Sequence, residues 1–274
     1  MPLINEQARI VENECVGPRL YLMVLESPQI AKTIKPGQFV HVRIPGMPDH
    51  ILRRPFSVYA ANPATNTIDI LYQTVGYGTD FMTTLTPDSA SLSVVEVLGP
   101  VGRCWMPPEH VKRALLVGGG VGAAPLYMLA EQLVKAQVHT DVVLGAQTEQ
   151  ALVCRGRYEV LLSSHEADVV APLCSTDDGS YGRAGFATSL VAEALESAAQ
   201  AARPYDYVAV CGPEPLMRAV AELCAGANVY CEVSMERRMA CGIGACLSCV
   251  VETTDGKLRA CVDGPVFDAT KVVW

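Results

Sequence analysis

Short apolar runs separated by proline or glycine turns dominate the first hundred residues of the chain. The runs cover residues 20–25, 39–44, 68–72 and 92–98. Several short strands at this spacing are typical of a β-sandwich or a small β-barrel. The pattern therefore predicts an antiparallel β-barrel domain over residues 1–103.

The pattern changes after this region, because apolar strands begin to alternate with amphipathic stretches. Strands are expected at residues 114–117, 140–144 and 207–210, and helices at 125–136 and 214–225. Strand-then-helix alternation indicates βαβ units on a parallel sheet. We therefore expect a parallel α/β domain over residues 104–226.

The final segment, residues 227–274, is too short to bury an independent core. Four of the 11 cysteines of the chain fall within 21 residues here. Domains this small usually need a covalent or metal staple. The fold class predicted is thus multi-domain β plus α/β, with a small C-terminal metal-binding domain.

Composition and charge narrow the class of protein. The 274 residues correspond to roughly two domains. A content of 50% hydrophobic and 18% charged residues excludes collagen-like and largely disordered chains. The net charge of 21 − 29 = −8, without a basic run, offers no electrostatic footprint for nucleic acid or for a membrane surface.

The N-terminus lacks a basic start and an apolar core, so no signal peptide is expected. The longest uncharged stretch, residues 114–130, contains several glycines and is too short for a typical spanning helix. An odd cysteine count also argues against a secreted disulfide framework. These features predict a cytoplasmic protein whose thiols stay reduced or bind metal.

The cysteines of the final segment have a specific spacing. Cys241, Cys246 and Cys249 form a C-x4-C-x2-C pattern, and Cys261 follows after eleven further residues. This is the plant-type spacing for a [2Fe–2S] cluster, although the fourth cysteine is closer than in plant ferredoxins. The small residues between the first two cysteines let backbone N–H groups approach cluster sulfurs. The alternatives are a structural zinc site, which prefers pairs of close C-x2-4-C knuckles, and buried core thiols.

A glycine-rich turn follows the apolar run 114–117. Its glycines are Gly118, Gly119, Gly120 and Gly122, and Pro125 begins the next amphipathic stretch. Such a turn at a helix N-terminus can cradle a diphosphate. It departs from G-x-G-x-x-G and has no acidic ribose partner, so a Rossmann domain proper is not supported. Cys211 and Gly212 follow a later strand and would lie at the same sheet edge, although Gly212-Pro213 alone also fits a simple turn.

The β region contains a candidate flavin-binding segment, Arg53-Arg-Pro-Phe-Ser57, between two expected strands. An arginine can bind a diphosphate, an aromatic ring can cover a ring face, and a serine can hydrogen-bond a flavin nitrogen. Leu71-Tyr-Gln73 and Gly76-Tyr-Gly-Thr79 follow it. On physical grounds alone, a solvated turn with an edge proline is the better explanation of the segment.

Taken together, these motifs resemble the ferredoxin-NADP reductase superfamily. Arg54-Pro-Phe-Ser57 is similar to its R-x-[YF]-S flavin motif, residues 118–125 to its GGG-x-G-x-x-P loop, and Cys211-Gly-Pro to its C-G-P motif. Within that superfamily, residues 176–182, 236–246 and 261–267 resemble the electron-transfer subunits of class 1B dihydroorotate dehydrogenases. The resemblance extends over nearly the whole chain and includes the short gap to the fourth cysteine.

The resemblance implies an NAD-linked oxidoreductase subunit that carries one FAD and one [2Fe–2S] cluster. Such a subunit pairs with a separate FMN-containing catalytic subunit in a heterotetramer. Electrons from dihydroorotate pass through FMN, the cluster and FAD to NAD+ in pyrimidine biosynthesis. Dihydroorotate chemistry is expected on the partner, and no acid–base catalytic residue is expected in this chain.

The same resemblance implies roles for individual residues. The cluster ligands would be Cys241, Cys246, Cys249 and Cys261. The FAD site would comprise Arg54 and Gly78 with Thr79 at the diphosphate, Pro55 and Phe56 at the isoalloxazine ring, Ser57 at the flavin nitrogen that exchanges hydride, and Leu71, Tyr72 and Gln73 at the adenylate or ribityl side. The NAD site would comprise Gly118, Gly119, Gly120 and Gly122 at the diphosphate, with Cys211 and Gly212 beside the nicotinamide.

NAD is favoured over NADP, because the segment after strand 140–144 begins Gly145-Ala-Gln-Thr148, without an arginine for a 2′-phosphate. Arg155 and Arg157 further along leave this choice open.

Two other functions remain open from the sequence. One is a flavin/iron–sulfur reductase subunit for another partner, of the sulfide dehydrogenase, NADPH:ferredoxin transhydrogenase or oxygenase type. The other is a non-catalytic redox sensor or metal-binding module. The interpretation based on the resemblance assigns FAD to residues 1–103, NAD to 104–226 and the cluster to 227–274.

Overall fold

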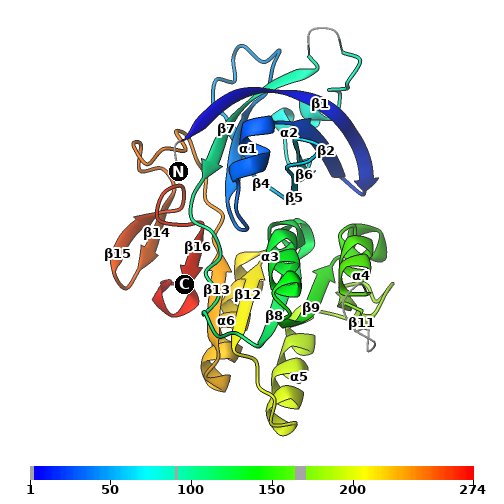
Figure 1. Ribbon diagram of the computed structural model, residues 1–274, viewed down its shortest axis with the longest axis vertical. Helices are drawn as coiled ribbons and strands as arrows, with labels where there is room; N and C mark the ends of the chain where they lie inside the picture. The colour runs from blue at the N-terminus through cyan, green and yellow to red at the C-terminus, as the bar shows by residue number, and fades with distance from the viewer. Residues whose placement is uncertain (1–2, 90–91, 164–170) are drawn as a thin grey trace.

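The computed structural model describes residues 3–89, 92–163 and 171–274. Its N-terminal half is a curled antiparallel sheet of seven strands in the order β4-β3-β7-β1-β2-β6-β5 (Figure 1). The strands are β1 (Ile4–Gly17), β2 (Leu20–Glu26), β3 (Phe39–Arg43), β4 (Arg54–Ser57), β5 (Ala60–Asn62), β6 (Thr67–Gln73) and β7 (Val94–Val101), with the helices α1 (Pro28–Thr33) and α2 (Tyr77–Met82) between them. The predicted antiparallel β domain is confirmed.

The core of this sheet forms because apolar side chains alternate along its strands. Ala8 and Ile10 of β1, Met23 and Leu25 of β2, and Ile70 of β6 are all fully buried, and their neighbours point to the other face. β1 holds the sheet together, since it pairs with β2 along one side and with β7 along the other.

The second half is a parallel sheet flanked by helices, as the alternating pattern predicts. Its strand order is β11-β10-β9-β8-β12-β13-β16, and only β16 runs antiparallel to its neighbour. The elements are β8 (Arg113–Gly119), η1 (Gly120–Ala123), α3 (Ala124–Lys135), β9 (His139–Ala146), η2 (Glu149–Ala151), α4 (Arg155–Ser163), β10 (Leu173–Thr176), β11 (Arg183–Ala184), α5 (Ala187–Gln200), β12 (Tyr207–Cys211), α6 (Glu214–Ala227), β13 (Tyr230–Ser234) and β16 (Val266–Asp268). Among the helices in the described ranges, none combines the length and apolar character that a bilayer crossing needs.

The cysteine-rich segment is built onto this second sheet. Between β13 and β16 in the chain lies a short hairpin of β14 (Val250–Thr253) and β15 (Gly256–Arg259), which stands beside the sheet (Figure 1). The turn η3 (Ala269–Lys271) follows β16. Cys249 and Cys261 belong to the same buried cluster as Val117 of β8 and Val210 of β12. The segment therefore shares its core with the α/β sheet.

Side chains from both halves and from the linker between β7 and β8, residues 102–112, fix the two sheets against each other. The indole N–H of Trp105 donates to the Pro125 carbonyl at 3.1 Å, at the start of α3. Arg157 of α4 pairs with Asp69 of β6 at 2.7 Å, and its guanidinium lies 4.6 Å from the centre of the Tyr59 ring. These contacts hold the β domain over the carboxyl edge of the parallel sheet.

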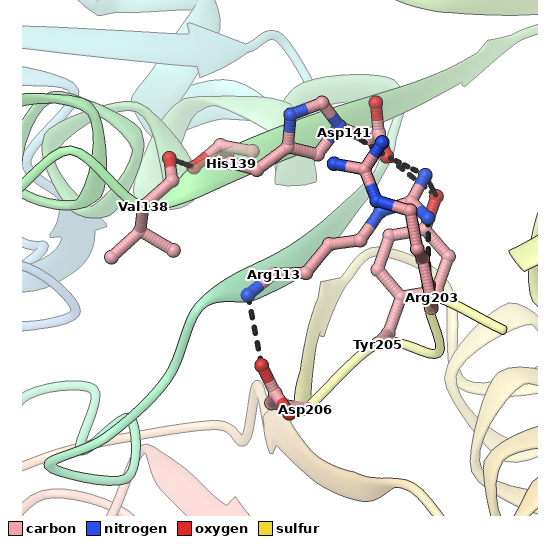
Figure 2. A network of polar contacts seen from close by, with 8 residues as sticks. Arg113, Val138, His139, Asp141, Arg203, Tyr205 and Asp206 are labelled. Atoms are coloured by element: carbon pink, nitrogen blue, oxygen red, sulfur yellow. Dashed lines mark hydrogen bonds and ion pairs between the residues drawn. The ribbon is translucent and has the colours of Figure 1, made fainter.

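A polar network closes the opposite edge, where β8, β9 and β12 begin (Figure 2). Arg113 donates to the Asp141 carboxylate at 2.9 Å, and the Tyr205 hydroxyl donates to the same oxygen at 2.7 Å. Arg113 also donates to the Arg203 carbonyl at 2.7 Å and stacks on the Tyr205 ring. His139 lies 3.4 Å from the shared carboxylate oxygen. The Asp141 carboxylate thus links the beginnings of β8, β9 and β12.

We expect Asp141→Ala to lower the free energy of unfolding by about 3 kcal/mol, because Arg113 and Tyr205 would lose their shared acceptor while largely buried. Glu193→Ala is the matched control, since it removes an ion pair with Arg183 in which both side chains are about half exposed. It should change stability by less than about 0.5 kcal/mol. Urea unfolding measures both variants, and equal losses would contradict a network specific to the sheet edge.

Candidate functional site

The candidate flavin segment is itself a strand, whereas the sequence placed it between strands. Arg54–Ser57 forms β4, which pairs antiparallel with β3 so that Phe39 faces Ser57 and Val42 faces Arg54. β4 lies at the edge of the sheet, where Pro55 costs no ladder hydrogen bond. All four side chains are half-buried, so they line the sheet edge and remain accessible to a ligand.

Arg54 and Gly78 come together although they lie on different elements. A Cβ at Gly78 would stand 2.9 Å from Nε of Arg54, so a larger residue would push the guanidinium from this position. The Arg54 side chain also donates to the carbonyl of Leu52, which holds it in place. Thr79 accepts from the backbone N–H of Val75 at 2.8 Å, so its hydroxyl is already engaged in capping α2. A diphosphate could thus meet the Arg54 guanidinium beside exposed backbone.

The side chains of the three residues at the end of β6 lie in different surroundings. Leu71 is buried in the core shared with Trp105 and the α/β domain, while Tyr72 points to the opposite face, into the core of the β domain. The Tyr72 ring stands edge-on to Phe56 with ring centres 6.0 Å apart. Its hydroxyl donates to Asn13 at 3.0 Å. Gln73 is exposed. The structure therefore links Tyr72 to β4 through Phe56.

The glycine loop and the Cys-Gly-Pro segment pack directly against each other. β8 and β12 are neighbouring parallel strands with Gly118 opposite Cys211. A Cβ at Gly122 would stand 2.6 Å from the Cys211 carbonyl oxygen, so this close approach requires glycine. Gly120 adopts a φ of +56° and faces open space. Two motifs distant in sequence thus form one backbone-lined edge, which suits a dinucleotide diphosphate.

Cys211 itself is suited to packing rather than to nucleophilic chemistry. Its side chain is 2% exposed, and Sγ lies 4.0 Å from the carbonyl oxygen of Ser234. Burial raises the pKa of this thiol, followed by a smaller effect of Glu236. A thiol that stays protonated is a poor nucleophile, in keeping with a structural neighbour of the nicotinamide.

The two arginines that left the choice between NAD and NADP open are both engaged. Arg155 stacks on the Tyr181 ring at 4.1 Å and lies 3.4 Å from Glu159 and 3.7 Å from Glu149. Arg157 pairs with Asp69. A 2′-phosphate would have to displace these partners, which favours NAD.

The turn after β10 is a further element of this edge, and the sequence predicts no role for it. The turn after β10 folds onto the turn after β9, because the Glu149 N–H donates to the Ser180 hydroxyl at 2.8 Å. Asp178 also accepts from Ser180 at 2.6 Å. The signal available from the sequence was the Thr176-Asp-Asp-Gly-Ser run, which ends a parallel strand.

The four cysteines of the final segment come from three stretches of chain. Cys241 and Cys246 lie on the loop after β13, Cys249 just before β14, and Cys261 just after β15. Cys249 and Cys261 are 2% and 3% exposed, whereas Cys246 is exposed. Across the described residues, no group of three or more acidic, histidine or cysteine side chains is already arranged to hold a metal ion.

Electrostatic contacts nevertheless link all four thiols. Slight burial raises the pKa of Cys241, but N–H groups of Ile243 and Cys246 and the Cys246 thiol outweigh it and lower that pKa to about 6. Burial raises the pKa of Cys261, and the neighbouring thiols of Cys249 and Cys241 raise it further. The Ile243 N–H points at the Cys241 sulfur from 3.5 Å. Four sulfurs beside backbone donors are the donor set that a [2Fe–2S] cluster uses.

Family models match two parts of the chain. Residues 236–273 match the iron–sulfur cluster binding domain of dihydroorotate dehydrogenase B. Residues 116–222 match the oxidoreductase NAD-binding domain. The first match contains the four-cysteine loop, and the second contains both the glycine loop and the Cys-Gly-Pro segment.

Solved structures share the architecture. An NADH-dependent reduced ferredoxin–NADP oxidoreductase, studied for flavin-based electron bifurcation, matches with a TM-score of 0.80 and 28% identity over 97% of this chain and 90% of its own. The ferredoxin reductase of carbazole 1,9a-dioxygenase has a TM-score of 0.65 at 20% identity, over 84% and 67% of the two chains. The fold is therefore that of the ferredoxin-NADP reductases, with a C-terminal iron–sulfur segment.

Curated relatives match over almost their full length. The dihydroorotate dehydrogenase B (NAD+) electron transfer subunit of Desulforamulus reducens is 36% identical over 271 residues, which are 97% of each chain. That of Bacillus caldolyticus is 36% identical over 276 residues, or 98% of each chain. The chain belongs to the family of dihydroorotate dehydrogenase B (NAD+) electron transfer subunits.

Proposed function

We propose that this chain passes electrons between a dihydroorotate-oxidising partner subunit and NAD+ through a [2Fe–2S] cluster and FAD, in pyrimidine biosynthesis. The observation that carries the proposal is the four-thiol loop built onto the sheet that presents the glycine loop. β13 of the nucleotide-binding sheet ends at Ser234, and Cys241 lies on the loop that follows it. The proposed cluster, which carries single electrons, is thereby built onto the same sheet as the proposed site for NAD, which carries hydride.

We assign each cofactor to the residues whose placement suits it. Arg54 and the backbone of Gly78 and Thr79 would hold the FAD diphosphate, with β4 residues Pro55, Phe56 and Ser57 along the isoalloxazine ring. We assign only backbone or edge contacts to Leu71, Tyr72 and Gln73, because the first two side chains are buried in separate cores. Bound flavin supplies the conversion between hydride transfer and single-electron steps.

The remaining assignments follow the two packed loops and the four thiols. Gly118, Gly119, Gly120 and Gly122 would face the NAD diphosphate, with Cys211 and Gly212 beside the nicotinamide. Cys241, Cys246, Cys249 and Cys261 would ligate the cluster. The functional division is then residues 1–103 for FAD, 104–226 for NAD and 227–274 for the cluster, the last sharing strands with the α/β sheet.

The catalytic partner we propose is an FMN-containing dihydroorotate dehydrogenase subunit in a heterotetramer. The relatives are named electron transfer subunits, which implies a separate chain for substrate oxidation. Within the described residues the strands form two seven-stranded sheets and a hairpin, and none of these is a TIM-barrel. We place the protein in the cytoplasm, since none of the 11 cysteines, all of them among the described residues, forms a disulfide, and a reducing compartment keeps thiols unpaired.

A second candidate is a reductase subunit for another electron-carrier partner. The 28% identity to an NADH-dependent reduced ferredoxin–NADP oxidoreductase favours this alternative. The chemistry within this chain would be the same, and only the partner would differ.

The partner experiment separates these two candidates. We expect the tagged chain, purified anaerobically from its native cells, to co-purify with an FMN protein, and the complex to reduce NAD+ when dihydroorotate is added. Absorbance at the NADH band measures the reaction. A complex that reduces ferredoxin but does not oxidise dihydroorotate would establish the second candidate instead.

Cys246→Ser should remove the visible absorbance of the cluster and leave that of the flavin, because the exposed Cys246 is a proposed cluster ligand, whereas the residues assigned to the FAD lie on β4, β6 and α2. Cys15→Ser is the matched control, since Cys15 is also an exposed thiol but lies on β1. Visible spectra with iron and sulfide analysis measure both variants. Loss of both chromophores in Cys246→Ser would contradict the proposed division of the chain, and a colourless zinc-containing wild type would contradict the cluster itself.

Gly78→Ala should weaken FAD binding at least tenfold, because the new methyl group would stand 2.9 Å from Arg54 Nε and push the guanidinium aside. Gly226→Ala is the control, since its added Cβ meets nothing within 4 Å. Fluorescence titration of the deflavinated protein with FAD gives both dissociation constants. Wild-type affinity in Gly78→Ala would show that Arg54 does not hold the diphosphate.

A further inference from the structure

A histidine lies between the proposed flavin strand and the cysteine loop. His41, on β3, is fully buried and stands opposite Pro55 of β4 in the strand register. Its Nε2 atom is 3.5 Å from the Met239 sulfur. A Cβ at Gly242 would stand 3.0 Å from both Cε1 and Nε2 of its ring. One imidazole thus contacts the loop between β13 and Cys246 while belonging to the strand that pairs with β4.

The contact with the loop is restrictive at Gly242. This residue has a φ of +69° and is itself buried, so both its conformation and the nearby ring require glycine. Gly242 lies between Cys241 and Ile243, whose N–H donates to the Cys241 sulfur. The position of the ring therefore limits how this donor can point at the sulfur.

Packing alone does not explain why an imidazole, with its polar Nδ1 atom, occupies this buried position. Within the described residues, Nδ1 of His41 is buried without a hydrogen-bond partner. Burial, and to a lesser extent Arg53, lower the pKa of His41 to about 4, so the ring is neutral near pH 7. A phenyl ring would fill the same space without an unsatisfied nitrogen. The neighbours of the ring are Phe39, 5.6 Å away between ring centres, and the cysteine loop.

We propose that His41 is a positioning residue that sets the loop backbone around Cys241 and thereby tunes the reduction potential of the cluster relative to the flavin. Hydrogen bonds to cluster sulfurs are a main determinant of such potentials. The inference rests on the proposed function, because it needs both redox groups. It adds a residue of the β domain to the environment of a centre whose ligands all come from the C-terminal segment.

The test is His41→Phe in the full chain, purified anaerobically with any partner that it retains. We expect FAD, iron and sulfide contents equal to wild type. The equilibrium constant for sharing one electron between cluster and flavin should shift at least tenfold, which is 59 mV for a one-electron couple. Redox titration followed by visible absorbance and by electron paramagnetic resonance of the reduced cluster measures the shift and the accompanying change in g values.

Three further variants make the result decisive. His41→Gln keeps a nitrogen donor near Nε2 and should return the potential toward wild type. Gly242→Ala presses on the ring from the loop side and should alter the same resonance signals. His110→Phe replaces an exposed histidine of the linker and should change neither quantity.

The outcomes separate the two proposals. A wild type without a [2Fe–2S] spectrum would overturn the proposed function. A wild type with the cluster, and a His41→Phe variant with the same potential and resonance, would overturn only the role of His41. If His41→Phe fails to fold, unchanged potentials in both His41→Gln and Gly242→Ala would overturn it as well.

Discussion

The structure depends on the pairing of β13 with β12 and β16, which joins the cysteine-rich segment to the parallel sheet. A segment of this length cannot bury enough apolar surface to fold alone. Its buried residues instead complete the core that α5 and α6 form on the sheet. The cost of ordering the cysteine loop is therefore offset by packing that the nucleotide-binding domain already supplies.

This shared core also fixes where the sites lie. The loop between β13 and β14 leaves the sheet at the end where the glycine loop and Cys211 meet. Gly102 of the linker packs against Pro265, and the Arg103 N–H donates to the Gly264 carbonyl at 2.5 Å. The β domain is thus clamped to the same segment from the other side. These contacts fix the position of the β domain relative to the cysteine-rich segment.

Local patterns were enough to predict the strands with continuous apolar runs, the βαβ units and the cysteine spacing. They did not reveal β1, because Ile4–Gly17 is rich in charged residues and only Ala8 and Ile10 are buried deep in the core. They also missed β4, whose extended form depends on pairing with β3. Both elements are stabilised by strands distant in sequence, and the local hydrophobic periodicity carries no information about such pairing.

The same distinction applies to the sites. Spacing alone was enough to predict the four cysteines as a candidate ligand set, because three of them lie close together in a pattern that [2Fe–2S] proteins use. The partners of Arg155 and Arg157 could not be predicted, since Tyr181 and Asp69 reach them only through the tertiary fold. Side chains with committed partners are poor recognition groups, because a ligand must first replace the interactions that they already make. The partners of Arg155 and Arg157 therefore favour NAD as much as the absence of an arginine from residues 145–148 does.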